Sequence, residues 1–184
     1  MSHPAGLAAA EIPEFVVLVD DDGTVLGSAD KSVIHDDVTP LHLAFSCHVF
    51  HADGRVLVTR RALAKRTFPG IWTNSFCGHP APGEEQAGAV RRRGATELGL
   101  EIAAVESVLP DFRYRATDAS GTVENEICPV FRTVVDADPQ PDPAEVAQWE
   151  WVSPRRLRTA VEAAPYAFSP WLVLQLREWP AFGR

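Results

Sequence analysis

The alternation of apolar and polar residues predicts two β-hairpins in the first third of the chain. Residues 15–26 hold two apolar, β-branched runs on either side of a polar turn that ends in Asp-Gly. Such a turn between such runs is typical of a hairpin. The same order returns further on, with a strand-like stretch at 41–50, a turn at 52–55 and an apolar run at 56–59. We therefore expect antiparallel strand pairs in this part of the chain.

The middle of the chain predicts a long loop followed by one clear helix. Residues 68–82 are rich in Gly, Pro, Asn and Ser, so we expect a loop there rather than a regular element. Long loops on rigid scaffolds often carry function. Residues 84–98 have an acidic start and Gly99 is placed to end a helix. Further strands are predicted at 105–109, 111–115, 122–135 and 149–152.

The last part of the chain predicts two helices. Residues 136–143 hold three prolines and three aspartates and read as an exposed connection. Ser153-Pro154 and Ser169-Pro170 each place a cap residue before a proline suited to the first helical turn. The sum is an α/β fold of the α+β type, a sandwich of mixed and antiparallel strands flanked by a few helices. We expect one domain over residues 1–184, with 1–12 flexible.

Composition and charge exclude several classes of partner. Apolar residues make up 46% and charged residues 23% of the chain, which is typical of a globular protein. The net charge of −8 argues against binding to nucleic acid and against stable association with a membrane. Residues 1–10 lack a basic segment followed by a long apolar core, and no later segment has the apolar length of a membrane span, so we expect a cytoplasmic protein. Any anionic substrate must be held by a few local basic residues.

Five candidate metal ligands come from four separate segments: His35, His42, His79, Glu124 and Glu126. Glu124 and Glu126 are two apart in an extended run, so both carboxylates point to one face while Asn125 faces the other. Two like charges on one face need a cation or protons between them. Imidazole and carboxylate donors suit divalent manganese, magnesium or zinc. Taken by themselves, these spacings are more typical of solvated strand residues than of a metal site.

A cysteine and a group of basic residues are further candidates. Cys77 lies among polar and small residues in the 72–80 loop, unlike a cysteine that fills a core, although an inert half-buried thiol is the other interpretation. Cys47 and Cys128 read as ordinary strand residues. With three cysteines and no CxxC spacing, a disulfide framework or zinc ribbon is not expected. The basic residues that could clamp a phosphate are Lys31, Arg60, Arg61, Lys65, Arg92 and Arg93.

The stretch from Gly78 through Glu84 and Arg92 to Glu97 resembles the Nudix signature, in which a loop and a helix present glutamates to magnesium bound to a diphosphate. Two of the three carboxylates of the signature's core are missing, at Arg93 and Thr96. A hydrolase that binds several magnesium ions would lose most of its ligands in this way. The resemblance therefore favours the fold and argues against the hydrolysis.

Six strings resemble the type I isopentenyl-diphosphate isomerase family, especially its bacterial members. They are LHLAFS (41–46), TRRA (59–62), WTNS (72–75), CGHP (77–80), PDFRYRA (110–116) and ENE (124–126), in the order of the family from about 15 to 171. The resemblance implies a Nudix-like fold. It also implies a metal-dependent enzyme of isoprenoid biosynthesis that interconverts isopentenyl diphosphate and dimethylallyl diphosphate by adding a proton at one carbon and removing one at another.

The resemblance also implies roles for individual residues. Cys77 and Glu126 match the two acid/base residues, Tyr114 a supporting hydroxyl, and Trp171 an aromatic wall beside the hydrocarbon. The metal ligands would be His35, His42, His79, Glu124 and Glu126, with Glu97 binding the magnesium that arrives with the substrate. The diphosphate would be held by Lys31, Arg61, Lys65 and Arg93. His48 departs from the family pattern, and with His51 it could change the number of metal ligands.

The expected cofactors are Mg²⁺ or Mn²⁺, with Zn²⁺ as an alternative at the histidine site, and neither a flavin nor a nucleotide. The expected partner is a small-molecule diphosphate, and the expected state a monomer or weak dimer. Two other functions compete with this interpretation. One is a Nudix-type diphosphate hydrolase, against which the gaps at Arg93 and Thr96 count. The other is a metal-binding or diphosphate-binding module without catalysis, which would not explain why a cysteine, a tyrosine and a tryptophan accompany the metal ligands.

Overall fold

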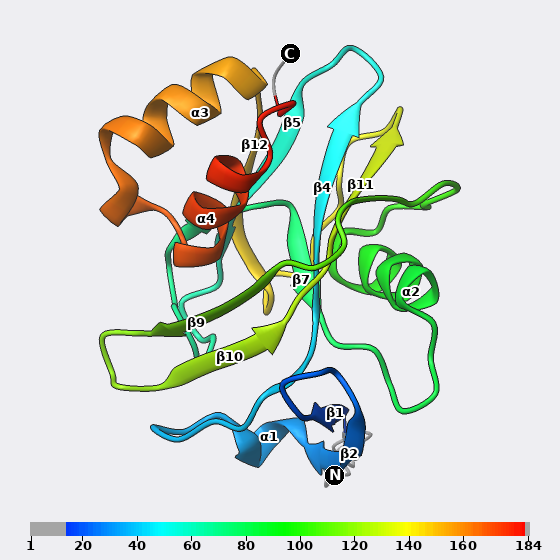
Figure 1. Ribbon diagram of the computed structural model, residues 1–184. Helices are drawn as coiled ribbons and strands as arrows, with labels where there is room; N and C mark the ends of the chain where they lie inside the picture. The colour runs from blue at the N-terminus through cyan, green and yellow to red at the C-terminus, as the bar shows by residue number, and fades with distance from the viewer. Residues whose placement is uncertain (1–13, 183–184) are drawn as a thin grey trace, which may run out of the picture.

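The computed structural model describes residues 14–182 and holds two β-sheets with helices on their outer faces (Figure 1). The segment expected to be flexible, 1–12, lies outside the described residues. Among the described residues, none of the helices is long and apolar enough to cross a membrane. The helices are α1 (Lys31–Ile34), α2 (Gln86–Leu98), α3 (Pro154–Ala163), a 3₁₀ turn (Pro165–Ala167) and α4 (Pro170–Glu178).

The first sheet has five strands in the order β2-β1-β3-β10-β9. Its predicted hairpin is confirmed, because β1 and β2 pair antiparallel on either side of the Asp-Gly turn. The neighbours β3 and β10 run parallel and place His42 opposite Glu126. The strands are β1 (Phe15–Val19), β2 (Val25–Asp30), β3 (His42–Leu43), β9 (Arg113–Thr117) and β10 (Val123–Ile127).

The second sheet has seven strands, with β12-β5-β4-β11-β8 as its main path, β6 paired to β5 and β7 paired to β4. Its central pair, β4 and β11, is parallel, and the remaining pairs are antiparallel. The strands are β4 (Phe45–His51), β5 (Val56–Arg61), β6 (Trp72–Thr73), β7 (Phe76–Gly78), β8 (Glu106–Leu109), β11 (Val130–Val135) and β12 (Val146–Val152). These two sheets and their helices form a mixed α+β sandwich, as the sequence predicted.

Alternation along β4 assigns its side chains to two different layers. Phe45, Cys47 and Val49 are fully buried in the core that includes α2. The intervening side chains face the opposite layer, where Phe50 packs with residues of α3 and α4. Because successive residues of a strand point to opposite faces, one short strand serves two cores. In Figure 1, α2 lies on one side of β4 and α3 and α4 lie on the other.

Two predicted strands are in fact broken, and both breaks have the same cause. The stretch 41–50 divides at Ala44, and the stretch 122–135 divides at Cys128-Pro129. At these points both segments leave the five-stranded sheet and enter the seven-stranded one, side by side. The backbone N–H of Ala44 donates to Ile127 O at 2.9 Å, and that of Ser46 donates to Pro129 O at 3.1 Å. The sequence pattern predicts one strand in each stretch, because the residues on both sides of the break form strands.

The prediction that 68–82 is a loop without regular elements is wrong in part. Two short strands, β6 and β7, form within it by pairing with β5 and β4. Their register sets Cys77 opposite Ser46. These pairings are long-range, so the local composition of Gly, Pro and Asn did not reveal them. The functional loop is thereby tied to the second sheet at two points.

The predicted helix ends are largely confirmed. The helix α2 begins two residues later than expected and ends at Gly99, whose φ of 63° lies in the left-handed region that glycine favours. Pro154 and Pro170 occupy the first turns of α3 and α4. The Ser169 hydroxyl accepts from Leu172 N, as an N-cap does. The sequence pattern missed α1, which begins where Asp30 accepts from Ser32 N at 2.8 Å.

Candidate active site

A cavity of about 750 Å³ is lined by residues of both sheets, α1, α2 and α4. The structure brings the predicted site residues together here. Of these residues only His42 does not line the cavity, because it is fully buried. The predicted residues that line the cavity are Lys31, His35, Arg61, Lys65, Cys77, His79, Arg93, Glu97, Tyr114, Glu124, Glu126 and Trp171. Segments far apart in the sequence therefore meet at one place.

Three imidazoles and a carboxylate form a compact cluster at one end of the cavity. The ring centroids of His35, His42 and His79 lie 5.2–5.9 Å from one another. One ligand atom from each of these residues and one from Glu126 lie within 4.8 Å of each other. Glu124 joins the cluster through His35, with 3.2 Å between the carboxylate and Nε2. All five predicted ligands therefore stand in one group.

The hydrogen bonds of the histidines match what a metal ligand needs. His42 Nδ1 donates to Pro40 O at 2.9 Å, and His35 Nδ1 donates to Lys31 O at 3.3 Å. When a backbone carbonyl fixes the ring in this way, the other nitrogen, Nε2, carries a lone pair that can bind a metal. His42 Nε2 and both ring nitrogens of His79 have no hydrogen-bond partner among the described residues. A donor set of imidazoles and carboxylates suits a divalent cation.

The strand β10 places the two carboxylates as predicted. Glu124 and Glu126 are both buried on the cavity face, while Asn125 points away and donates to Thr39 O. Burial alone would raise the pKa of Glu126, but His42 and His79 beside it hold that pKa well below its usual range. Burial lowers the pKa of His79 to about 4, which leaves this imidazole neutral. A neutral ring next to an ionised carboxylate is the state that binds metal.

Tyr114 faces Glu126 from the neighbouring strand. The two residues are directly opposed in the register of β9 and β10. Burial raises the pKa of the Tyr114 hydroxyl well above its usual range, and the carboxylate of Glu126 adds to this shift. The hydroxyl therefore stays protonated at neutral pH and is a hydrogen-bond donor within the cavity.

Cys77 lies on β7, so its thiol reaches the cavity from the second sheet while Glu126 reaches it from the first. The sulfur is 3.2 Å from Ser46 Oγ and 3.4 Å from Asn74 Oδ1. Burial raises the pKa of the thiol to about 12, and the Ser46 hydroxyl opposes this shift in part. The thiol keeps its proton at neutral pH. A protonated thiol and an ionised carboxylate thus line one cavity from different sheets.

The indole of Trp171 forms an aromatic wall of the cavity. Its Nε1 donates to Asn74 Oδ1 at 2.9 Å, which fixes the plane of the ring. The ring centroid lies 5.2 Å from that of Phe68 and 5.6 Å from that of Tyr114. The guanidinium carbon of Arg61 stands 5.6 Å from the indole centroid. An indole face can stabilise positive charge through its quadrupole.

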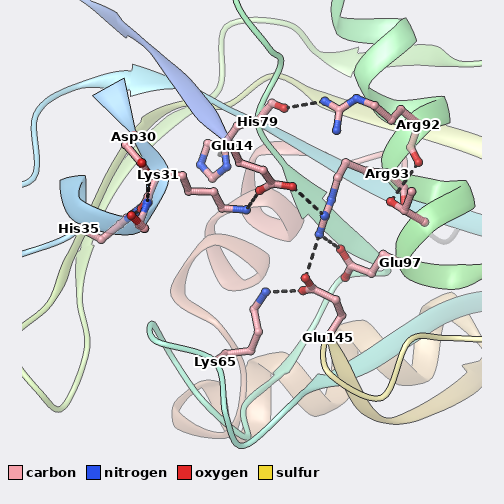
Figure 2. Close-up of polar contacts among 12 residues, drawn as sticks. Glu14, Asp30, Lys31, His35, Lys65, His79, Arg92, Arg93, Glu97 and Glu145 are labelled. Carbon is pink, nitrogen blue, oxygen red and sulfur yellow. Dashed lines mark hydrogen bonds and ion pairs between the residues drawn. The ribbon is translucent and has the colours of Figure 1, made fainter. Parts of the chain in front are cut away.

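The other end of the cavity holds basic residues that are paired with carboxylates (Figure 2). Arg93 Nη2 donates to Glu97 Oε2 at 2.6 Å and lies 3.5 Å from Glu145 Oε1. Lys65 also pairs with Glu145. Burial alone would raise the pKa of Glu145, but Lys65 and Arg93 hold it at about 2. Lys31 pairs with Glu14 at 2.5 Å.

Sequence reasoning missed Glu14, Glu145 and Asn74. Glu145 follows the segment that was predicted to be an exposed connection, and no local pattern marks it. Asn74 lies inside one of the motif strings, but its function as an acceptor for Trp171 Nε1 depends on contacts across the fold. Burial of an asparagine in a Gly-rich loop is the signal that a structure supplies and a sequence does not.

Other candidates do not line the cavity. Arg60 donates to Gly70 O, and Arg92 pairs with Glu84. His48 is buried against Gln175, and His51 pairs with acidic residues near the end of β4. The expectation that His48 and His51 could change the metal count is therefore not met, because neither joins the cluster of four metal-binding groups found among the described residues.

The NUDIX domain model matches residues 40–172, and this match assigns the chain to the NUDIX class of domains. The isopentenyl-diphosphate Delta-isomerase of Clavibacter michiganensis is 63% identical over 89% of this chain and 84% of its own. The protein of the same name from Kocuria rhizophila is 62% identical over 90% of this chain and 92% of its own. The chain belongs to the isopentenyl-diphosphate Delta-isomerase family, as the sequence motifs predicted.

Solved structures support the fold. A Deinococcus radiodurans protein superposes with a TM-score of 0.71 at 22% identity, covering 90% of this chain and 99% of its own. A MutT protein from Methanosarcina mazei superposes with a TM-score of 0.63 at 18% identity, covering 77% and 94%. At these identities the likeness concerns the fold alone. The predicted Nudix-like architecture is thereby confirmed.

Proposed function

We propose that this chain interconverts isopentenyl diphosphate and dimethylallyl diphosphate by metal-assisted protonation and deprotonation, with Cys77 and Glu126 as the acid/base pair. The observation that carries the proposal is their placement: a thiol on one sheet and a carboxylate on the other line the same cavity. Moving the double bond of an unactivated alkene requires a proton donor at one carbon and a proton acceptor near another. Holding both groups beside the bound substrate supplies a large part of the rate.

The remaining residues of the cavity suit the charge that develops. Protonation of the alkene creates a tertiary carbocation or something close to it, and the indole face of Trp171 stabilises positive charge. Tyr114, opposite Glu126 in the β9–β10 register, can share a hydrogen bond with that carboxylate. The proton gained at one carbon is balanced by the proton lost at the other, so the composition of the substrate does not change.

The metal would be held by His35, His42, His79, Glu124 and Glu126. When bound, a divalent cation there supplies positive charge that tunes the acidity of Glu126. We propose Mg²⁺ or Mn²⁺, with Zn²⁺ as an alternative, because nitrogen and oxygen donors are mixed in this site. No flavin or nucleotide is required by this chemistry.

The diphosphate would be bound at the opposite end by Lys31, Arg61, Lys65 and Arg93. The carboxylates that now pair with Lys31, Lys65 and Arg93 would give way to phosphate oxygens, which accept the same hydrogen bonds. Glu97 would bind the magnesium ion that arrives with the diphosphate. The negative net charge of the chain makes these local basic residues the ones that attract the substrate.

We further propose that the protein acts in the cytoplasm as a monomer or weak dimer, without nucleic acid or a stable membrane contact. The three cysteines of the chain are all free thiols in the structure. Free thiols are typical of a reducing compartment. Cell fractionation would test the compartment, and light scattering would measure the molar mass and so the oligomeric state.

The deciding experiment is incubation with isopentenyl diphosphate and Mg²⁺ in deuterated water. The expected product is dimethylallyl diphosphate that carries deuterium at carbon, without release of phosphate. Cys77→Ala should lower turnover by well over the ~10²-fold typical of losing one acid/base group. Cys47→Ala is the matched control, because that cysteine is buried against the α2 core rather than in the cavity, and it should keep turnover near that of the parent protein. Release of phosphate would favour a hydrolase, and a fully active Cys77→Ala would refute the catalytic assignment.

A further inference from the structure

A chain of buried hydrogen bonds leads from His48 to the sulfur of Cys77. His48 Nε2 lies 2.9 Å from Gln175 Oε1, and Gln175 Nε2 donates to Ser46 Oγ at 2.8 Å. Ser46 Oγ in turn lies 3.2 Å from Cys77 Sγ. His48, Gln175 and Ser46 each have an exposed fraction of 0%. Buried polar groups of this kind hold one arrangement only when every link is satisfied.

The surroundings of His48 set the direction of this chain. Its Nδ1 has no hydrogen-bond partner among the described residues, and its ring packs against Trp179 and Phe182, each with a centroid distance of 5.5 Å. Burial lowers the pKa of His48 to about 4, so the ring is neutral and carries one proton. A buried N–H without an acceptor is rare, so the bare nitrogen is Nδ1 and the proton is on Nε2. Nε2 therefore donates to Gln175 Oε1.

This direction determines what the Ser46 hydroxyl does. Because the Gln175 oxygen is taken by His48, the amide nitrogen faces Ser46 and Ser46 Oγ is an acceptor in that bond. The single proton of the hydroxyl is then free to be donated to a sulfur. Cys77 Sγ at 3.2 Å is closer than Cys128 Sγ at 3.6 Å. The geometry favours donation to Cys77.

The second neighbour of the Cys77 sulfur is already committed. Asn74 Oδ1 accepts from Thr73 Oγ1 at 2.8 Å and from Trp171 Nε1 at 2.9 Å. Its amide nitrogen donates to the backbone oxygens of Cys47 and Phe76, which fixes the orientation of the amide. A carbonyl oxygen has two lone pairs, and both are used. The Cys77 thiol donates to the same oxygen at 3.4 Å, the longest of the three hydrogen bonds that this oxygen accepts.

We propose that His48, Gln175 and Ser46 are positioning residues that make the Cys77 sulfur a hydrogen-bond acceptor, while its thiol proton is held only by the longer hydrogen bond to Asn74 Oδ1 at the cavity wall. The proposal rests on the acid/base role of Cys77 proposed above. When the thiol passes its proton to a substrate carbon, the S–H bond is broken, a C–H bond is formed and the sulfur keeps the electron pair. The Ser46 hydroxyl then donates to a sulfur that has become negative. A hydrogen bond to a charged acceptor is stronger than one to a neutral acceptor.

Helix α4 supports both sides of Cys77. Trp171 and Gln175 are four residues apart and lie on the same face of the helix. The first reaches the sulfur through Asn74 and the second through Ser46. A helix far from Cys77 in the sequence thus carries both the aromatic wall and the positioning amide, which links their placement.

The test compares kcat, KM and metal content in four variants. Gln175→Met removes both hydrogen bonds of the side-chain amide and keeps a side chain of similar length. Gln175→Glu keeps the shape, but its carboxylate accepts from the Ser46 hydroxyl, which turns the Ser46 proton away from Cys77. We expect kcat to fall about tenfold in each, as for the loss of one hydrogen bond to a charged group. KM and metal content should not change, because the residues proposed to bind the diphosphate and the metal are not members of this series of hydrogen bonds. Ser46→Ala should lower kcat to the same extent, and Gln175→Met should have no further effect in the Ser46→Ala background.

Leu176→Ala is the matched control for damage to α4. Leu176 is buried in the core between α3 and α4, and its apolar side chain is not a member of the hydrogen-bonded series from His48 to Cys77. This control should lower the melting temperature yet keep kcat near that of the parent protein, at a temperature where both are folded. Gln175→Glu decides the question if Gln175→Met does not fold.

Three results would overturn the proposal. The first is an unchanged kcat in the folded Gln175 and Ser46 variants while Cys77→Ala is inactive; the catalytic assignment would then stand without the positioning chain. The second is a Gln175→Met effect that multiplies with that of Ser46→Ala, which indicates independent packing effects. The third is a ¹⁵N NMR spectrum in which His48 carries its proton on Nδ1. An active Cys77→Ala would instead refute the proposed function itself, and the positioning role with it.

Discussion

Gly78 is the residue at which a single added methyl group should disturb both stability and substrate binding. It is buried on β7 between Cys77 and His79 and lines the cavity. A Cβ built on it would be 2.8 Å from Arg93 Cγ and 2.9 Å from Phe45 Cζ. Carbon atoms attract best at about 3.5–4.0 Å, so Gly78→Ala must increase its separation from both neighbours by roughly half an ångström or more.

Arg93 can move more easily than Phe45, but movement of Arg93 alone does not relieve the contact with the Phe45 ring. Phe45 has an exposed fraction of 0% and packs edge-on against Phe76, so its ring has no free space. Overpacking of this kind costs about 1–3 kcal/mol. For a chain of this size each kcal/mol lowers the melting temperature by about 2–4 °C, which gives a decrease of about 2–12 °C. Displacement of Arg93 should also raise KM, because this residue is proposed to hold the diphosphate.

Thermal unfolding and steady-state isomerase kinetics would measure these effects. Gly88→Ala is the matched control, since its added Cβ would meet only Glu84 Cγ, at an ordinary 3.8 Å. Gly88 is inside α2, where replacement of glycine by alanine should stabilise the protein by about 0.4–1 kcal/mol. If Gly78→Ala melts and turns over like the parent protein, the close approach of β7 to Phe45 and Arg93 is wrong.

Four further outcomes are expected. Removal of metal by a chelator should abolish turnover and Mn²⁺ or Mg²⁺ should restore it; full activity in protein shown to be metal-free by elemental analysis would refute the histidine site. Glu124→Gln should lose bound metal, whereas Glu97→Gln should keep it and mainly raise KM, and equal metal contents in Glu124→Gln and the parent would contradict this division. Cys77→Ser keeps the size but is a far weaker acid, so kcat should fall about as far as in Cys77→Ala. Between about pH 6.5 and pH 4 the unfolded chain takes up a proton at His48 that the folded chain does not, because burial lowers the pKa of His48 to about 4. Stability should therefore fall with pH in this window, and chemical denaturation of His48→Phe should show a shallower fall.

The sequence alone was sufficient for the elements whose signals are local. The Asp-Gly turn at 22–23 predicted the first hairpin, and Gly99 marked the end of α2 because only a residue tolerant of left-handed φ suits that position. Ser169 before Pro170 marked the start of α4. Period-2 geometry placed Glu124 and Glu126 on one face. Each of these inferences depends on residues close together in the chain, where geometry is set by backbone sterics and short hydrogen bonds.

The sequence motifs also identified the family, because several long strings occur in a fixed order. They placed the site residues in one group before any distance was known. The structure agrees in bringing these side chains to one cavity. Their individual roles stay predictions until the variants are measured.

The tertiary structure alone decided the features that depend on long-range pairing. The chain switches sheets at Ala44 and at Cys128-Pro129, yet both points lie inside stretches that the sequence predicted as single strands. Glu145 pairs with Lys65, 80 residues away, and Gln175 donates to Ser46, 129 residues away. Such contacts leave no local pattern, because their partners meet only when separate segments pack. The sequence therefore determined which groups carry the chemistry, and the packing of the two sheets and α4 determined how those groups are held.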